Sequence, residues 1–185
     1  SRNGQAVTIR FEDFVVDVVP GFKREGGGYL IPNSITQRWV STDPQKHVEI
    51  FSTANSTHNG NLVPFIKMIK GWNKNSGKYF RSFHLEVMAL QTLNGVTISD
   101  FPSGMRYFFD KTRSYVTKQN PDPAGYGGDV GNYIKSQEEI QEAANKFQLS
   151  YERALKAEEY ASKGYIKDAI DTWIKIFGDY FPAYG

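Results

Sequence analysis

Asp17 is a lone carboxylate inside the apolar run FVVDVV at residues 14–19. The β-branched residues on both sides predict a strand, and the continuous apolar run predicts that this strand is buried. A buried, unpaired carboxylate is costly, so it needs a strong hydrogen-bond donor, a cation or a metal. We therefore expect Asp17 to ligate Mg²⁺, which proteins hold through one or two carboxylates plus substrate phosphates. The competing interpretation is an aspartate at a sheet edge that accepts hydrogen bonds from neighbouring backbone N–H groups.

A second group of candidate residues lies in the predicted helices. Lys67 and Lys70 are three residues apart, on the side of their helix opposite to its apolar stripe. Such lysines usually form a solvated face, but two ammonium groups can also meet the phosphates of a nucleotide. Ser82 and Phe83 fall where the next helix begins, and a helix N-terminus can bind phosphate. Ser82 could equally be an ordinary N-cap, and Phe83 either stacks on a base or belongs to the core.

Other kinds of site are excluded or incomplete. The chain has no cysteine, and its three histidines lack the spacing of metal ligands, which argues against zinc sites and excludes disulfides. The glycines at 26–28 are not followed by Gly-Lys-Ser or Gly-Lys-Thr, so there is no P-loop, and no Gly-x-Ser-x-Gly elbow occurs. No Asp-x-Asp or Asp-x-Glu pair accompanies Asp17. The predicted metal site is therefore incomplete in this sequence.

Length and charge restrict the class of protein. The chain has 185 residues, a length that is enough for one domain or two small lobes. Its formal net charge of +2 gives no sign of a polybasic arm or an acidic tail. It contains no apolar stretch long enough to span a bilayer and no signal peptide, so we expect a cytoplasmic protein without a membrane partner. Because the first residue is Ser rather than Met and a strand follows closely, we expect a fragment whose N-terminal part is missing.

The elements that must position these residues follow a simple order. Alternating and apolar patterns predict strands at 5–11, 14–19 and 29–32, the first two joined in an antiparallel hairpin. Helical periodicity begins near Asp43, and the predicted helices are 62–73, 83–93, 104–116, a long helix beyond the Pro- and Gly-rich loop 121–128, and 166–177. The apolar stripes comprise Leu62, Phe65, Ile66, Ile69 and Trp72 or Asn73 in the first helix, Ile140, Ala144, Phe147, Tyr151, Ala154 and Leu155 in the long helix, and Ile166, Ala169, Ile170, Trp173 and Phe177 in the last. Strands first and helices afterwards predict an α+β fold.

Several segments, taken in order, resemble the C-terminal half of a nucleotidyltransferase of the cyclic GMP-AMP synthase type. They are VDVVPGF at 16–22, YLIP at 29–32, residues 39–47, residues 62–73, FRSFHLE at 80–86 and residues 173–182. The bacterial, oligonucleotide-signalling branch is the most similar. The resemblance implies the remnant of a polymerase-β-like palm, with short antiparallel strands, at residues 1–40. A C-terminal helical bundle that binds nucleotide would follow at 41–185.

The resemblance also implies roles for individual residues. Asp17 would be the third metal-binding carboxylate of the palm, in a site for two Mg²⁺ ions. Lys70 would contact the donor triphosphate, Ser82 would hydrogen-bond it, and Phe83 would occupy the position of an aromatic that stacks on a base, with Lys67 as a further nucleotide contact. The Gly-Ser helix start and the first two carboxylates of the family are not in this chain. We therefore expect the chain alone to be inactive, because phosphoryl transfer depends on positioning and on charge neutralisation by metals.

The function implied by the resemblance is the joining of NTPs, such as ATP or GTP, into a cyclic or short linear oligonucleotide second messenger in anti-phage signalling. Such an enzyme needs no long nucleic acid, and we allow for a regulatory protein partner. One alternative is an RNA-modifying nucleotidyltransferase of the CCA-adding or 2′-5′-oligoadenylate type, against which the near-neutral charge argues. Another is a non-catalytic helical interaction module, suggested by the tetratricopeptide-like pattern of residues 157–173.

Overall fold

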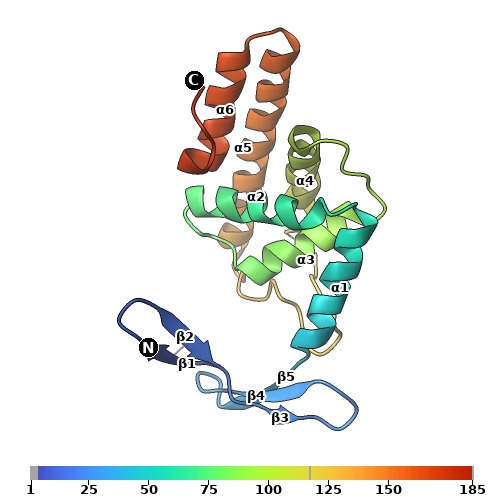
Figure 1. Ribbon diagram of the computed structural model, residues 1–185, viewed down its shortest axis with the longest axis vertical. Helices are drawn as coiled ribbons and strands as arrows, with labels where there is room; N and C mark the ends of the chain where they lie inside the picture. The colour runs from blue at the N-terminus through green and yellow to red at the C-terminus, as the bar shows by residue number, and fades with distance from the viewer. Residues whose placement is uncertain (1–3, 117, 185) are drawn as a thin grey trace. The chain divides into compact units, whose positions relative to one another are not determined.

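The computed structural model describes residues 4–116 and 118–184, and the chain divides into two compact units (Figure 1). The first unit comprises Ser1–Ser52 and Pro121–Gly128, and the second comprises Thr53–Asn120 and Asp129–Gly185. Short antiparallel strands precede the helices along the chain, which confirms the α+β class. The predicted division at residue 40 into a palm and a nucleotide-binding domain concerns function and stays a prediction.

The first unit contains two small antiparallel sheets. One pairs β1 (Val7–Arg10) with β2 (Val15–Val18), and the other has the order β3 (Phe22–Lys23), β4 (Tyr29–Asn33), β5 (Arg38–Thr42). The β1–β2 hairpin was predicted, and the backbone N–H of Phe11 closes its turn by donating to the carbonyl of Phe14 at 2.9 Å. The strands β3 and β5 were not predicted. The side-chain oxygen of Asn33 accepts hydrogen bonds from the backbone N–H groups of Ile35 and Thr36. These bonds form the local turn that joins β4 to β5.

The loop 121–128 is fixed within this unit by one buried carboxylate. The Oδ1 atom of Asp122 lies 2.5 Å from Nε2 of His47, on the first turns of α1 (Pro44–Thr57). The backbone N–H groups of Ala124 and Gly127 also donate to Asp122, at 3.0 and 2.7 Å. Burial raises the pKa of Asp122, but the hydrogen bond from His47 and those from the two N–H groups outweigh it, so the pKa lies below its ordinary value. The sequence correctly predicted an irregular segment here.

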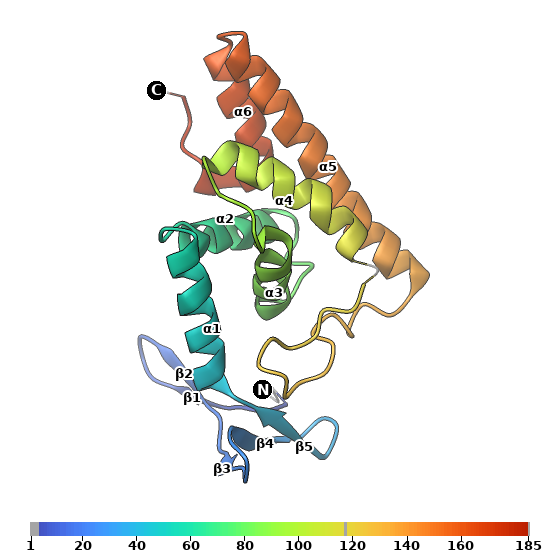
Figure 2. The same ribbon diagram turned by 90° about the vertical axis from the view of Figure 1, so that its right-hand side faces the viewer.

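The second unit is helical. It contains α2 (Leu62–Asn75), α3 (Ser82–Leu93), α4 (Phe101–Tyr115), α5 (Gln137–Ser162), α6 (Ile166–Phe177) and the short 3₁₀ turn η1 (Gly178–Tyr180). Both α4 and α6 pack along α5, the longest of these helices, and α5 and α6 form a helical hairpin (Figure 2). Within residues 4–116 and 118–184, no helix is both long and apolar enough to cross a membrane.

An aromatic cluster forms the centre of the second unit. Its members are Trp72, Phe80, Phe108, Phe109 and Phe147, all buried. The ring centroid of Trp72 lies 4.9 Å from that of Phe147, and its indole N–H donates to the hydroxyl of Ser150 at 2.7 Å. The polar edge of the indole is therefore satisfied inside the core, as a buried donor must be.

The predicted apolar stripes are right for α2 and only partly right for α5 and α6. Leu62, Phe65, Ile66 and Ile69 are buried as predicted, and the two alternatives for the last position, Trp72 and Asn73, are both buried. In contrast, Leu155 and Ile166 are 48% and 47% exposed. The buried residues of α5 include Phe147, Ala154 and Ala157, and those of α6 include Ala169, Trp173 and Phe177.

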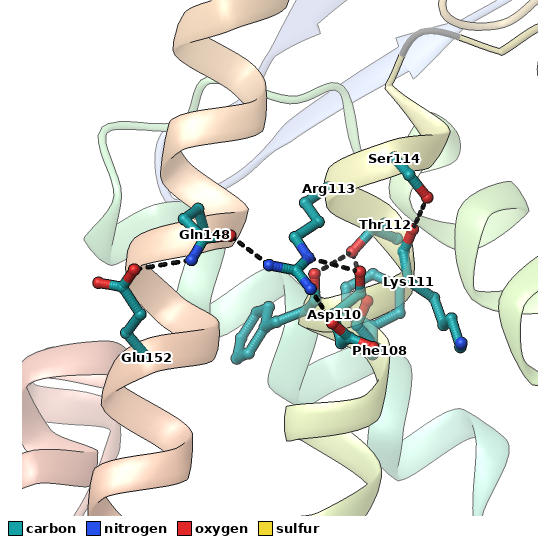
Figure 3. A network of polar contacts seen from close by, with 9 residues as sticks. Phe108, Asp110, Lys111, Thr112, Arg113, Ser114, Gln148 and Glu152 are labelled. Atoms are coloured by element: carbon teal, nitrogen blue, oxygen red, sulfur yellow. Dashed lines mark hydrogen bonds and ion pairs between the residues drawn. The ribbon is translucent and has the colours of Figure 1, made fainter.

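A polar network holds α4 to α5 (Figure 3). The guanidinium of Arg113 donates to Oε1 of Gln148 at 2.5 Å and pairs with the carboxylate of Asp110 in its own helix. The amide of Gln148 in turn donates to Glu152 at 2.7 Å, and the guanidinium also lies 4.8 Å from the ring centroid of Tyr151. These contacts fix the register of the two helices that enclose the aromatic cluster.

Candidate functional site

A pocket of about 450 Å³ lies along α2 in the second unit. Four lysines line it, Lys67, Lys70, Lys74 and Lys78, together with Gly71, Asn73, Phe80, Ser82 and Tyr180. We call it the lysine pocket. Three of the lysines are three or four residues apart on α2 and therefore share one face of that helix. The fourth, Lys78, follows in the turn after α2.

The position of these lysines follows from the amphipathic character of α2. The helix buries its apolar stripe in the aromatic core, so the opposite face points outward. Lys67 is exposed and Lys70 is partly exposed, as the sequence predicted for both. The structure adds Lys74, which continues the same spacing and which the sequence analysis did not single out.

The charges around the pocket are unbalanced. The ammonium of Lys70 lies 2.5 Å from the carboxylate of Glu86 on α3. Among the described residues, Lys67, Lys74 and Lys78 form no ion pair with a carboxylate. Asp179 lines the adjoining hollow together with Lys74 and Lys78. The four lysines still outnumber Glu86 and Asp179, and this excess of positive charge suits an anion with several negative charges.

The first turn of α3 supplies part of the pocket wall. Ser82 is the first residue of the helix, and the N-cap is Arg81, in an extended conformation with φ −69° and ψ 140°. The interpretation of Ser82 as the N-cap is therefore wrong, because the cap is the residue before it. Backbone N–H groups in a first helical turn have no partner within the helix, and the helix dipole favours anions there. The N-terminus of α3 thus adds to the positive field of the lysines.

Hydrogen bonds from α2 and from Tyr133 hold the start of α3 in place. The side-chain amide of Asn73 donates to the carbonyl of Phe80 at 2.8 Å and accepts the N–H of Phe80 at 3.0 Å. The hydroxyl of Tyr133 accepts the N–H of Arg81 at 3.0 Å and lies 2.9 Å from Nδ1 of His84. Burial lowers the pKa of His84 to about 4, so this imidazole is neutral at pH 7. The wall that carries Ser82 is therefore well fixed.

The predicted nucleotide contacts fall into two groups. Lys67, Lys70 and Ser82 come from two helices and meet at the lysine pocket, although nothing in the sequence alone required them to meet. Phe83 is half-buried and is not among the residues that line the pocket. Its role as a base-stacking aromatic stays a prediction.

Asp17 differs from the sequence-based expectation. The strand β2 is exposed along its whole length, so the prediction of a buried carboxylate is wrong. In the described residues β2 pairs only with β1, which leaves both faces of the hairpin uncovered. The Oδ1 atom of Asp17 accepts a hydrogen bond from the hydroxyl of Thr8 on β1 at 2.6 Å. This donor is a side chain, not one of the backbone N–H groups considered above.

The described residues do not form a complete metal site. Over residues 4–116 and 118–184, no group of three or more His, Asp or Glu side chains could hold a metal ion. Asp17 offers an exposed carboxylate of the hard, oxygen type that Mg²⁺ prefers, but it is a single ligand. Among residues 4–116 and 118–184, Asp17 therefore fits a single contact to Mg²⁺ and not a complete site.

Comparison with known sequences gives a consistent relationship. Residues 1–55 match the family model of the Second Messenger Oligonucleotide or Dinucleotide Synthetase domain. Over 191 aligned residues the chain is 29% identical to a probable cyclic nucleotide synthase of Bacillus cereus (strain VD146), covering 99% of this chain and 57% of that protein. It is 27% identical to a cyclic AMP-AMP-AMP synthase of Acinetobacter sp. (strain ATCC 27244 / 9458), covering 97% of this chain and 54% of that protein. The chain thus spans somewhat more than half of these relatives.

Solved structures share the fold. The chain matches CdnC of E. coli MS115-1 in its complex with HORMA-deltaN, with a TM-score of 0.77 at 17% identity, over 97% of this chain and 64% of that one. It also matches the structure of the same CdnC with ATP, with a TM-score of 0.65 at 17% identity, over 97% of this chain and 65% of that one. Taken together, the family model over residues 1–55, the two relatives and the shared fold support a nucleotidyltransferase of the cyclic GMP-AMP synthase type.

Proposed function

We propose that this chain is part of a template-independent nucleotidyltransferase that joins NTPs into a cyclic or short linear oligonucleotide second messenger. The observation that carries the proposal is the lysine pocket, where cations from α2 meet the N-terminus of α3. In this reaction an acceptor hydroxyl attacks the α-phosphate of an NTP and pyrophosphate leaves. Lys67, Lys70 and Ser82 hold the triphosphate, and Phe83 stacks on a base. The name of the Acinetobacter relative supports ATP as one substrate.

Asp17 is proposed as one Mg²⁺ ligand of the intact enzyme. When bound, Mg²⁺ supplies positive charge to the reacting phosphate. Two features support this role, the exposed carboxylate of Asp17 and its place within the segment that matches the synthetase family model. Because this sequence has no second acid at Asp-x-Asp spacing, we propose that the 185-residue chain alone is inactive.

The cellular context is also a proposal. CdnC was solved in a complex with HORMA-deltaN, and on that likeness we propose a regulatory protein partner for this protein. A cytoplasmic role in anti-phage signalling agrees with an enzyme that uses NTPs to make a second messenger. No long nucleic acid is needed as template or acceptor.

The test of the proposed pocket is nucleotide binding by calorimetry. ATP and inorganic tripolyphosphate should both bind, and Lys70→Ala and Ser82→Ala should weaken both ligands by about tenfold, since each substitution removes a charged or polar phosphate contact. Lys167→Ala, an exposed lysine on α6 that does not line the pocket, is the matched control. Equal affinities for Lys70→Ala and Lys167→Ala would remove the pocket from the mechanism.

A second measurement tests activity. The chain incubated with Mg²⁺ and mixed NTPs should give no oligonucleotide, and product from the chain alone would contradict the proposed inactivity. Strong binding of duplex or transfer RNA that falls steeply with salt would favour the RNA-modifying alternative.

A further inference from the structure

The aromatic ring of Tyr180 forms one side of the lysine pocket. Tyr180 is 62% exposed, and the ammonium of Lys74 lies 5.2 Å from the centroid of its ring. The same tyrosine and Lys74 also line an adjoining hollow of about 360 Å³. A ring this exposed contributes little to the core, yet it borders two hollows on the surface of the second unit.

The backbone around Tyr180 is held firmly to α2. The side-chain amide of Asn75 donates to the carbonyl of Ile176 at 3.0 Å and so caps the C-terminal end of α6. Gly178 follows with φ 60° and ψ −144°, a conformation that glycine alone adopts readily. A Cβ atom at this position would lie 2.4 Å from Oδ1 of Asn75, so the close approach of the two chains also requires glycine.

The ring itself rests against a helix position without a side chain. A Cβ atom at Gly71 would lie 3.8 Å from Cγ of Tyr180, so a methyl group would just touch the ring and a longer side chain would cover it. A glycine in the middle of a helix costs about 1 kcal/mol relative to alanine. Gly71 lies between Lys70 and Lys74, so the ring stands directly beside the cations of α2.

A nucleotide site needs cations for the phosphates and an apolar or aromatic surface for the base, and this pocket has lysines next to an exposed aromatic ring. Lysines bind the phosphates, while an aromatic face stacks on the base with little dependence on sequence. The volume of the pocket, about 450 Å³, is within the ordinary range for a small-molecule site. An inorganic anion would use the lysines but would gain nothing from the ring.

We propose that Tyr180 is the platform on which the base of a nucleoside triphosphate stacks while its phosphates occupy the lysine pocket, and that Lys74 is an additional phosphate contact. Phe83 does not line this pocket, so the base that stacks on Phe83 belongs to a second nucleotide. This inference rests on the proposed function, because it places an NTP in the same pocket. It gives the C-terminal turn η1 a direct part in nucleotide binding, alongside α2 and α3.

The experiment compares three ligands on the protein and its variants. ATP and tripolyphosphate are titrated by calorimetry, and the triphosphate of 2-aminopurine riboside is followed by fluorescence, which stacking quenches. Tyr180→Ala should raise the Kd of ATP about tenfold and abolish the quench, but leave the Kd of tripolyphosphate unchanged. Tyr180→Phe keeps the ring and should behave as the unaltered protein does. Lys74→Ala should weaken ATP and tripolyphosphate together.

The matched control is Tyr165→Ala, which removes a tyrosine of similar exposure, 56%, between α5 and α6. Unchanged far-ultraviolet circular dichroism and melting temperature confirm that Tyr180→Ala folds. If Tyr180→Ala leaves ATP binding intact, or weakens ATP and tripolyphosphate equally, Tyr180 is not a base platform. The proposal that the lysine pocket binds phosphates would be unaffected by that result. If neither ligand binds in a manner sensitive to Lys70→Ala, the proposed function fails and this inference fails with it.

Discussion

Replacing Asn73 by alanine should lower the unfolding free energy of the second unit by about 3 kcal/mol. Asn73 is 6% exposed, and its amide satisfies both the N–H and the carbonyl of Phe80, which is 3% exposed. The substitution leaves these two buried backbone groups without partners, at about 1–3 kcal/mol each. Alanine returns about 0.5 kcal/mol through its higher helix propensity. The net loss is about 1.5–5.5 kcal/mol, and a value of about 3 kcal/mol lies near the middle of this range.

The assay is urea unfolding followed by tryptophan fluorescence in a Trp39→Phe background. Trp39 belongs to the first unit, so the remaining tryptophans, Trp72 and Trp173, report on the second unit alone. With a slope of about 2 kcal/mol per molar urea, a loss of 3 kcal/mol moves the midpoint down by about 1.5 M. The slope itself should not change, because the surface exposed on unfolding is nearly the same.

The control is Asn145→Ala, which removes an exposed asparagine of α5 that accepts one surface hydrogen bond from Gln141. Exposed substitutions of this kind usually change stability by less than about 0.5 kcal/mol. A midpoint for Asn73→Ala within about 0.3 M of the Asn145→Ala midpoint would refute the reasoning. It would mean that the two bonds to Phe80 contribute no stability, and that the wall of the lysine pocket is not held by Asn73.

Two further substitutions test the structure at other points. Gly178→Ala should cost about 1–3 kcal/mol, because alanine does not adopt this backbone conformation readily and its Cβ would collide with Asn75; thermal unfolding measures the loss. The second substitution concerns His84. Burial lowers the pKa of His84 from its ordinary value of about 6.5 to about 4. Between these two pH values the unfolded chain therefore binds more protons than the folded chain. The unfolding free energy should therefore fall by about 2 kcal/mol from pH 7 to pH 5. In the His84→Asn variant, the asparagine Oδ1 can replace Nδ1 in the contact with Tyr133, and the pH-dependent loss of unfolding free energy that His84 causes should be absent. Urea titrations of both proteins at pH 7 and pH 5 measure this difference.

The helical part of the fold was predictable because its signals are local. In α2, spacing at i, i+3, i+4 and i+7 identified the buried positions, with Trp72 and Asn73 as alternatives that are both buried. The same spacing placed Lys67 and Lys70 on the outward face. It would also have identified Lys74, had the lysines been followed for one more turn.

Burial of a strand is not a local property, and this is why the prediction for Asp17 failed. An apolar run indicates which residues could be covered, but the covering is done by neighbouring strands and helices. In the described structure β2 has one neighbour, β1, and all four of its residues are exposed. The proposed role of Asp17 as a Mg²⁺ ligand therefore no longer follows from the cost of burying a charge. It depends on the similarity of its segment to the synthetase family.

Tyr180 could not be predicted to join the pocket for a similar reason. Its position depends on the hydrogen bond from Asn75 to Ile176, two residues separated by 101 positions in the sequence. No pattern within a window of one helix contains that information.

The lysine pocket and the aromatic core lie on opposite sides of α2, so the stability of the second unit and its affinity for a ligand should be linked. α2 buries Trp72 on one side and presents Lys70 and Lys74 on the other, while the buried Asn73 also lines the pocket. Sites carried on rigid elements hold their geometry better than sites on loops. The core contacts of α2 therefore position the cations, and the hydrogen bonds of Asn73 extend this control to the first turn of α3. In this arrangement a substitution that leaves every lysine in place can still weaken binding, by loosening the helix that carries them.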